Sequence, residues 1–147
     1  QRIEDLDTQI AVWHKASPVS QRLATIPGIG PLVATAIAAT VPNADAFRSG
    51  REFAAWLGLV PRQRSTGGKQ RLGRISRAGD GYIRRLPIIG AQAVLLRSKA
   101  AHADPWVQGL LARRPRLVVA AALANKTARV AWAVMTKGQP YRQPAAA

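Results

Sequence analysis

Hydrophobic residues recur along most of this chain at the three- and four-residue spacing that is typical of amphipathic helices. The first segment shows this spacing at four positions, Ile3, Leu6, Ile10 and Trp13. It predicts that residues 1–16 form the end of a coiled-coil helix or an amphipathic helix. Ser17 and Pro18 then stop that helix and start the next, because serine caps a helix N-terminus and proline fits its first turn. We find no alternating strand pattern of useful length, so the fold class is predicted to be mainly α.

Further helices are predicted over residues 17–137, which we expect to form one helical domain. Two short apolar helices flank the turn at residues 27–31. Ser49 and Glu52 have the spacing of a capping box, which predicts a helix that Gly58 ends. The remaining helices are expected at residues 80–101 with interruptions at Pro87 and Gly90, at 104–113 and at 115–137.

Two segments lack helical periodicity. Residues 59–79 are expected to form an ordered loop or a short hairpin. Residues 138–147, with the sequence "GQPYRQPAAA", have the composition of a disordered tail. The helical domain is therefore expected to carry one irregular segment between its helices and a disordered end.

Positive charge is the dominant property of the composition. The chain has 22 lysines and arginines against 7 acids, for a formal net charge of +15 at pH 7. Charge of this size disfavours a compact fold by self-repulsion unless a polyanion offsets it. Nucleic acid is therefore the expected partner, ahead of an anionic membrane or an acidic protein.

Several classes of site are not expected from this composition. The chain has no cysteine, which removes disulfides and thiolate metal sites, and His14 and His102 lie too far apart in sequence to suggest a metal site. No apolar run reaches the roughly 20 residues that cross a bilayer, so we expect a cytoplasmic protein without a membrane partner. Trp56, Trp106 and Trp132 are expected to pack in the core rather than to stack on bases.

The segment of about residues 20–41 matches the helix-hairpin-helix pattern, in which a turn of alternating apolar residues and glycines joins two short helices. The turn reads Pro27-Gly28-Ile29-Gly30-Pro31. Glycines let backbone N–H groups approach a phosphate, and the helix that follows contributes its positive N-terminal end. We therefore expect Gly28, Ile29 and Gly30 to contact the DNA backbone without reading bases. A tight helix–helix corner without a ligand has the same pattern.

A cluster of cations in the irregular segment supplies the second expected DNA contact. It consists of Arg62, Arg64, Lys69, Arg71, Arg74 and Arg77, and no acid lies between them. Side chains on a loop can converge on one phosphodiester, which side chains along one helix face cannot do. Contacts with phosphates also make DNA affinity dependent on the salt concentration. The alternative is a solvated basic surface.

Ser65, Thr66, Gly67 and Gly68 lie in the middle of this cluster. A serine hydroxyl is a poor nucleophile without a base or strong electrostatic help. The flanking arginines suit the stabilisation of a transition state at phosphorus, and the glycines let the backbone bend around the target. No histidine or carboxylate lies near in sequence to act as the base. The residues alone leave two interpretations open, a turn that binds phosphate passively and a serine nucleophile.

Three segments, in this order, closely resemble the C-terminal domain of the insertion-sequence 110/116/902 transposase family. They read "LATIPGIGPLVATAIAATV", "FRSGREFAAWLGLVPRQRSTGGKQRLGRISRAGDGYIRRL" and "ALANKTARVAWAVMTKGQPYR". The resemblance extends from about Trp13 to Arg142 and so covers nearly the whole chain.

The resemblance implies a DNA recombinase that excises and inserts mobile elements, directed by a structured guide RNA from the element. It also implies that a full-length member has an N-terminal RNase H-like domain whose acidic tetrad binds Mg²⁺, followed by a coiled coil and this domain. This domain supplies a serine that attacks DNA and forms a covalent 5′-phosphoserine link. The position that matches it here is Ser65, with Thr66 as the lesser candidate. A bacterial, nucleoid-associated homo-oligomer is expected on the same basis.

The chain departs from the family pattern in two respects. The N-terminal acidic domain is absent, and Asp45, Asp80 and Asp104 do not have the spacing of a metal tetrad. No cofactor is therefore expected in this chain, Mg²⁺ is expected in the missing domain, and the chain alone is expected to be inactive. Pro87 stands inside a helix that the family continues regularly, where a kink costs about 3 kcal/mol.

Three alternatives to a serine-bearing recombinase domain follow from the same residues. One is a non-catalytic helix-hairpin-helix module that only holds nucleic acid. Another is an inactive transposase remnant. The third is an oligomerisation segment, in which the apolar residues of 1–16 pair two chains.

Overall fold

The computed structural model describes residues 1–76 and 79–143, and it describes the backbone alone for the strand residues 63–66 and 69–74. The chain is mainly α-helical, as the hydrophobic spacing predicts, and these described residues include one two-stranded sheet. In chain order the elements are α1 (Arg2–Ala16), α2 (Pro18–Leu23), α3 (Pro31–Thr40), the 3₁₀ turn η1 (Ala44–Ala46), α4 (Gly50–Trp56), β1 (Pro61–Thr66), β2 (Lys69–Ile75), α5 (Gly81–Arg97), α6 (Lys99–Ala103), α7 (Pro105–Leu111) and α8 (Arg116–Lys137).

The helix starts follow the capping residues of the sequence. The Ser17 hydroxyl accepts a hydrogen bond from the Ser20 N–H at 3.2 Å, and Pro18 occupies the first turn of α2. The Ser49 hydroxyl accepts from the Glu52 N–H at 3.2 Å at the start of α4. These bonds satisfy N–H groups that have no partner within the helix. The predicted N-caps at Ser17 and Ser49 are confirmed, whereas the Glu52 carboxylate accepts from the Arg48 N–H and not from the Ser49 N–H that completes a capping box.

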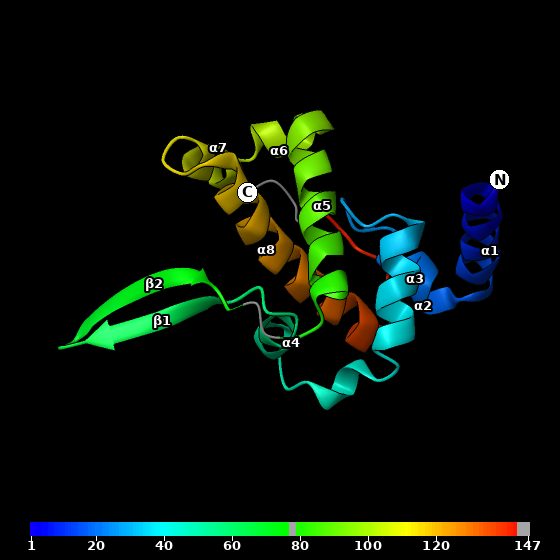
Figure 1. Cartoon of the computed structure of the whole chain (residues 1–147), viewed down its shortest axis with the longest axis horizontal. Helices are drawn as coiled ribbons and strands as arrows, with labels where there is room; N and C mark the ends of the chain where they lie inside the picture. Colours follow the sequence, from blue (N-terminus) through cyan, green and yellow to red (C-terminus); the bar gives the residue numbers. More distant parts are fainter. Residues whose placement is uncertain (77–78, 144–147) are drawn as a thin grey trace.

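The central helix of the fold is α8, which packs against α5, α4 and α2 (Figure 1). Its buried face is made largely of alanine, with a valine near each end. Small side chains let neighbouring helices approach closely, and the larger core residues, such as Leu23, Phe53 and Leu95, come from those neighbours. By length and composition α8 is also apolar enough to cross a membrane, within the part of the chain that the structure describes. Its buried face, 39% of that apolar stretch, packs in the domain core.

The helix predicted at residues 80–101 differs from the structure in two ways. Helix α5 runs without interruption through Pro87 and Gly90, and the break comes instead at Ser98, which caps α6 by accepting a hydrogen bond from the Ala101 N–H. Pro87 is buried in the core. Tertiary packing therefore holds the helix together across a residue that lacks a backbone donor.

The start of the predicted tail lies against the domain. The Tyr141 N–H donates to the Thr25 hydroxyl at 2.8 Å, and the half-buried Tyr141 side chain packs on the core. The Tyr141 side chain lies between the α2–α3 turn and α8, beside Ile26 and Val130. The disorder expected for residues 138–147 stays a prediction. Residues 144–147 lie outside the described part of the chain.

The tryptophans divide between core and surface. Trp132 is partly buried, and its indole N–H donates to the Ala44 carbonyl at 3.1 Å. Trp56 and Trp106 remain 41% and 40% exposed, so the expected core placement is wrong for both of these rings. Trp56 packs against Phe53 and Phe47 at ring-centroid distances of 6.1 and 5.5 Å, which leaves its outer side in solvent.

Candidate nucleic-acid interface

The basic segment forms an antiparallel hairpin that projects from the helical body (Figure 1). Gly67 and Gly68 form its turn, and their φ angles are +60° and +80°. A two-residue turn with positive φ at both positions matches the right-handed twist of paired strands, and glycine adopts it without steric cost. The Gly-Gly pair between two short runs was the sequence signal for this hairpin. Because the segment lacks hydrophobic alternation, the sequence left an ordered loop and a short hairpin both open, and the structure shows the hairpin.

The hairpin places the candidate nucleophile close to its tip. The Cα of Ser65 pairs in register with that of Gln70, Thr66 pairs with Lys69, and Arg64 pairs with Arg71. The residues named for cleavage and phosphate binding therefore lie on two adjacent strands next to one turn. The side chains of Ser65, Thr66 and the cations at 64, 69, 71 and 74 lie outside the described atoms, and Arg77 lies outside the described residues altogether.

The root of the hairpin is held to the helical body by hydrogen bonds. The Asn125 amide on α8 donates to the Leu59 carbonyl at 3.3 Å, and Leu59 is 1% exposed. The Ser76 N–H donates to the Val60 carbonyl at 3.0 Å, which closes the base of the two strands. The exposed Arg62 guanidinium donates to the Ser76 carbonyl at 3.2 Å. Arg62 is thus fixed at the root, several residues from the tip.

A close backbone contact fixes the chain where it returns from the hairpin. Gly79 has φ +87°, and a Cβ at this position would stand 2.2 Å from the Trp56 carbonyl oxygen. No side chain other than hydrogen fits there. Gly79, which follows β2, therefore packs directly on the end of α4. The next residue, Asp80, caps α5, because its carboxylate accepts a hydrogen bond from the Tyr82 N–H at 2.7 Å.

The predicted helix-hairpin-helix segment forms two helices, α2 and α3, joined by residues 24–30. Gly28 has φ +88°, and its backbone lies against α5, where a Cβ on Gly90 would stand 2.1 Å from the Gly28 oxygen. The glycine at 28 therefore serves a helix contact inside the protein. Ile29 is 4% exposed and belongs to the core. Gly30 is different, because a Cβ there would meet nothing within 4 Å and it begins α3 without a side-chain cap.

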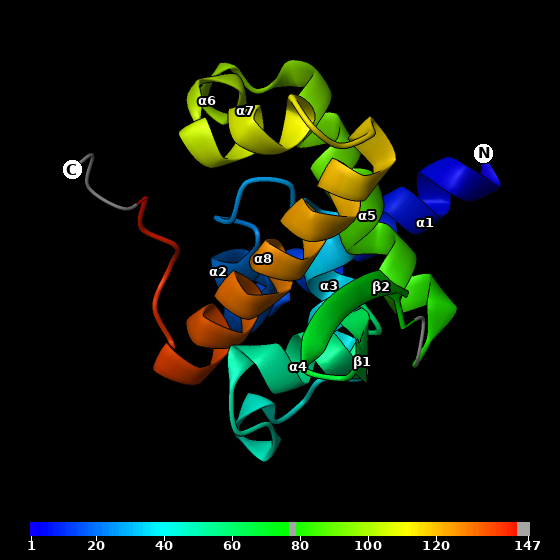
Figure 2. The ribbon, with the colours of Figure 1, turned by 90° about the vertical axis from the view of Figure 1, so that its left-hand side faces the viewer.

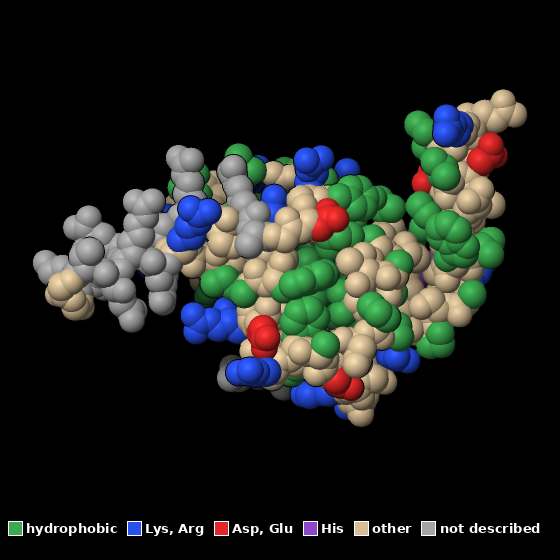
Figure 3. All heavy atoms as spheres, turned by 60° about the horizontal axis from the view of Figure 1, so that its bottom comes forward, with side chains coloured by type: hydrophobic (Ala, Val, Ile, Leu, Met, Phe, Trp, Pro, Cys, Tyr) green, Lys and Arg blue, Asp and Glu red, His purple; other side chains and the backbone are tan. Residues whose placement is uncertain are grey.

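Three acids of the domain accept hydrogen bonds from backbone N–H groups. Asp80 and Asp104 cap α5 and α7, and the Glu52 carboxylate accepts from the Arg48 N–H at 2.9 Å. Within residues 1–76 and 79–143 no group of three or more histidine, cysteine, aspartate or glutamate side chains is placed to hold a metal ion. Figure 3 shows many Lys and Arg side chains and few acidic ones around the body beside the hairpin. The described donor set does not fit Mg²⁺, and the positive charge of the surface is largely unneutralised.

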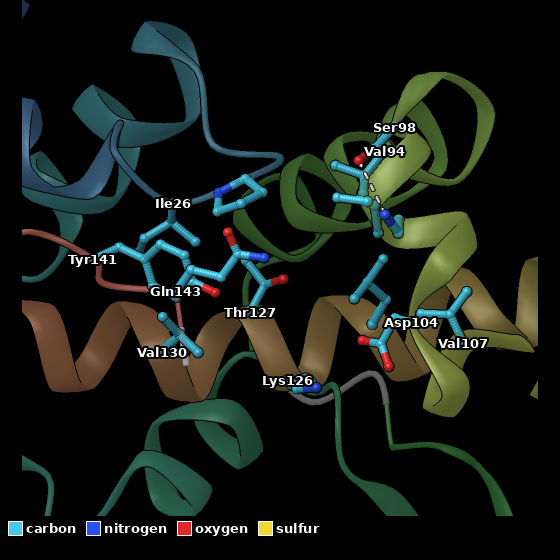
Figure 4. Close-up of a pocket in the computed structure, with 15 residues that line it drawn as sticks. Ile26, Val94, Ser98, Asp104, Val107, Lys126, Thr127, Val130, Tyr141 and Gln143 are labelled. Carbon is cyan, nitrogen blue, oxygen red and sulfur yellow. Dashed lines mark hydrogen bonds between the residues drawn. The ribbon is translucent and has the colours of Figure 1, made fainter. Parts of the chain in front are cut away.

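A cavity of about 210 Å³ lies between α5, α6, α8 and the chain end (Figure 4). Its walls are mostly apolar, and Tyr141 lies beside Ile26 on one side. Both charged side chains on its rim already interact with Trp106. The Asp104 carboxylate accepts from the Trp106 N–H at 2.9 Å, and the Lys126 ammonium lies 4.6 Å from the Trp106 ring centroid. The cavity is therefore a weaker candidate for a phosphate ligand than the hairpin.

One cluster of exposed cations was missed from the sequence. Arg113, Arg114 and Arg116 surround Pro115 in the turn between α7 and α8. The run "RRPR" directly before a long apolar helix, with no acid beside it, was the available signal.

Comparison with known proteins gives consistent matches. The model of the transposase IS116/IS110/IS902 family matches residues 20–106. The chain is 52% identical over 143 residues to a probable family 20 transposase of Pseudomonas aeruginosa, covering 96% of this chain and 42% of that protein. It is 46% identical to the putative transposase y4pF/y4sB of Sinorhizobium fredii, covering 97% and 38%. It is 41% identical to the transposase for insertion sequence element IS1328 of Yersinia enterocolitica, covering 96% and 43%. The chain spans about two fifths of the length of these relatives.

Proposed function

Because the chain belongs to the IS116/IS110/IS902 family of transposases, we propose that it is the DNA-binding part of such an enzyme and supplies a serine that cleaves DNA. The observation that carries this proposal is the hairpin, which extends a serine position and several cationic positions beyond the helical body. A projecting two-stranded ribbon reaches a DNA backbone that a flat helical surface does not. The register places Arg64 opposite Arg71, and two like charges directly opposite each other destabilise paired strands. A bound phosphodiester would offset this repulsion.

The proposed chemical step is a transesterification at phosphorus. The Ser65 Oγ loses its proton, attacks a phosphodiester and forms an Oγ–P bond, while the P–O3′ bond breaks. The 3′ oxygen takes up a proton and leaves as a hydroxyl, so a 5′-phosphoserine link remains. Arg64 and Lys69, which lie next to the turn, are proposed to bind the non-bridging oxygens, because fixed cations stabilise charge that develops in such a transition state. Arg62, which donates to the Ser76 carbonyl at the hairpin root, is proposed to contact a neighbouring phosphate. Thr66 is the lesser candidate for the nucleophile.

The rest of the domain is proposed to hold DNA near the hairpin. Arg71, Arg74 and Arg77 add contacts to phosphates, and Gly67 and Gly68 let the ribbon turn sharply. At the α2–α3 turn we assign the contact to Gly30 and the exposed start of α3, since uncapped N–H groups at a helix start suit an anion. Gly28 and Ile29 support that turn from behind through their contacts with the core.

Further partners belong to the full-length protein. We propose that the serine is activated by a group from the part of the longer relatives that this chain does not span, where the family's Mg²⁺ is also expected. A guide RNA and a second copy of the chain are proposed partners of that full-length protein. Helix α1, which has no buried residue, is the proposed site of chain pairing.

The test is a covalent adduct assay with a full-length transposase that contains this domain. Ser65→Ala is expected to abolish protein–DNA adducts on denaturing gels and to leave DNA affinity within a few-fold of the parent. Thr66→Ala is the matched control and is expected to keep the adducts. If adducts survive in Ser65→Ala, the serine does not have this role.

A non-catalytic module is the second candidate, because the described residues include no metal-ligand cluster and the sequence places no base near Ser65. On this hypothesis Ser65→Ala and Thr66→Ala change nothing, whereas Arg71→Gln and Arg74→Gln weaken DNA binding and flatten its dependence on salt. An adduct in the parent protein that Ser65→Ala abolishes would reject it.

A further inference from the structure

The turn between α7 and α8 carries three arginines that the proposed function does not use. Arg113, Arg114 and Arg116, which we call the turn patch, are all exposed. The N–H groups of Arg113 and Arg114 donate to the Leu110 carbonyl at 3.2 and 2.8 Å, so the backbone of the turn is fixed. Their side chains form no hydrogen bond or ion pair with any residue in the described part of the chain. The patch is therefore an ordered group of unneutralised cations.

The charge of the turn patch is unfavourable in the free protein. Helix α8 begins at Arg116, has no acid in its first turn and has no side-chain cap at Pro115. The N-terminal end of a helix carries a partial positive charge, which repels cations and attracts anions. Arg116 stands in this first turn of α8 and is repelled by the helix, and the like charges of Arg113 and Arg114 lie beside it in the turn between α7 and α8. Binding of a polyanion would remove this repulsion.

The turn patch lies at the same end of the molecule as the hairpin. Figure 1 shows the turn and the hairpin on the same side, and Figure 2, viewed from that side, shows the turn above the hairpin. Helix α8 connects them, because Arg116 starts the helix and Asn125 binds the Leu59 carbonyl at the hairpin root. Nine residues at about 1.5 Å rise give about 14 Å between these points along the helix axis.

This spacing suits duplex DNA. The major groove of B-DNA is about 12 Å wide, so the turn patch and the hairpin root are about as far apart along α8 as the two backbones that border one groove. In A-form RNA the major groove is deep and narrow, and its phosphates lie closer together across it. Two further cations, Lys126 and Arg129, are exposed on the stretch of α8 beside the hairpin root.

We propose that the turn patch is a second contact with the backbone of duplex DNA, which works together with the hairpin to hold one groove. The inference rests on the proposed DNA-binding function and adds a surface to it. Because phosphate contacts release counterions, each contact steepens the fall of affinity with salt by about 0.9 in a double-logarithmic plot. Three contacts account for a slope of about 2.7.

The test is the salt dependence of binding, measured by fluorescence anisotropy with this chain and a short labelled duplex. The variant Arg113→Gln/Arg114→Gln/Arg116→Gln is expected to bind more weakly and to have a slope flatter by about 2.7. Between about 50 and about 200 mM salt its affinity should therefore fall about 40-fold less than that of the parent. Arg114→Gln alone should flatten the slope by about 0.9, and it guards against a folding defect in the triple variant.

A matched control removes the same charge from other parts of the surface. Arg2 and Lys15 lie on α1, and Lys137 lies at the C-terminal end of α8. The variant Arg2→Gln/Lys15→Gln/Lys137→Gln is expected to keep the slope within about one unit of the parent, because distant charges are screened at these salt concentrations. Equal slopes for the two triple variants would overturn the proposal. A loss of affinity for a labelled RNA hairpin with none for the duplex would overturn it as well.

These outcomes are separable from a failure of the proposed function. If the parent chain binds duplex DNA and Ser65→Ala abolishes adducts in the full-length enzyme, an unchanged slope in the turn-patch variant rejects the second contact alone. If the parent chain shows no salt-dependent binding to duplex DNA, both proposals fail.

Discussion

Replacement of Gly90 by alanine tests how the α2–α3 turn is held on the domain. Gly90 lies inside α5, and a Cβ added there would stand 2.1 Å from the Gly28 carbonyl oxygen and 3.1 Å from its carbonyl carbon. Both atoms belong to the backbone of the turn. Gly28 has a positive φ, and the neighbouring Ile29 is buried. The obstacle therefore cannot move aside as a flexible side chain would.

The expected cost follows from two opposing effects. Overpacking of a closely packed contact costs about 1–3 kcal/mol, and the rigid backbone places this site near 3 kcal/mol. Alanine has a higher helix propensity than glycine by about 1 kcal/mol, which works in the opposite direction. The net destabilisation is about 2 kcal/mol. For a chain of this length that lowers Tm by about 4 to 8 °C.

The assay is thermal and urea unfolding of this chain, followed by circular dichroism. Gly109→Ala is the matched control, because Gly109 lies inside α7 and a Cβ there would meet nothing within 4 Å. It is expected to gain about 0.5–1 kcal/mol from helix propensity alone. If Gly90→Ala is as stable as the parent, the close contact between α5 and the turn does not constrain the fold, and the reasoning fails.

Two further substitutions test local contacts by the same unfolding measurements. Ser49→Ala removes the cap of α4 and is expected to cost about 1 kcal/mol; unchanged stability would show that the bond to the Glu52 N–H contributes nothing. Tyr141→Ala removes a half-buried ring from the core and is expected to cost about 1.5 kcal/mol. A variant as stable as the parent would mean that the chain end does not dock in solution.

The proposals for Ser65 and for the turn patch concern separate properties of the protein. Cleavage depends on one oxygen at the hairpin tip, and its loss changes adduct formation. DNA affinity depends on the number of phosphates that cationic side chains contact, and loss of these contacts changes the dependence of affinity on salt. Because the two readouts are independent, a domain that binds DNA without cleaving it can be recognised.

Local rules in the sequence were sufficient for the positions of most helices and for the excess of positive charge. Ser17 with Pro18, Ser49 with Glu52, and Asp104 with Pro105 each mark a helix start, because a cap acts within a few residues of chain. The basic run at 62–77 and the family resemblance were likewise legible from residue order alone. They led to residues 59–79 as the candidate site, where the structure shows the short hairpin that was one of the two expectations.

Contacts between segments that are distant in sequence determined the features that local rules did not predict. Pro87 stays inside a continuous helix because its surroundings in the core hold both halves. Gly28 meets Gly90 across more than sixty residues of sequence, so the role of that glycine as a helix contact cannot be read from the turn. The placement of the hairpin and the turn patch at one end depends on α8, to which Asn125 ties the hairpin root. Spacing along the chain reports one helix or turn at a time, whereas a surface for a duplex arises only when packing brings several of them to the same side.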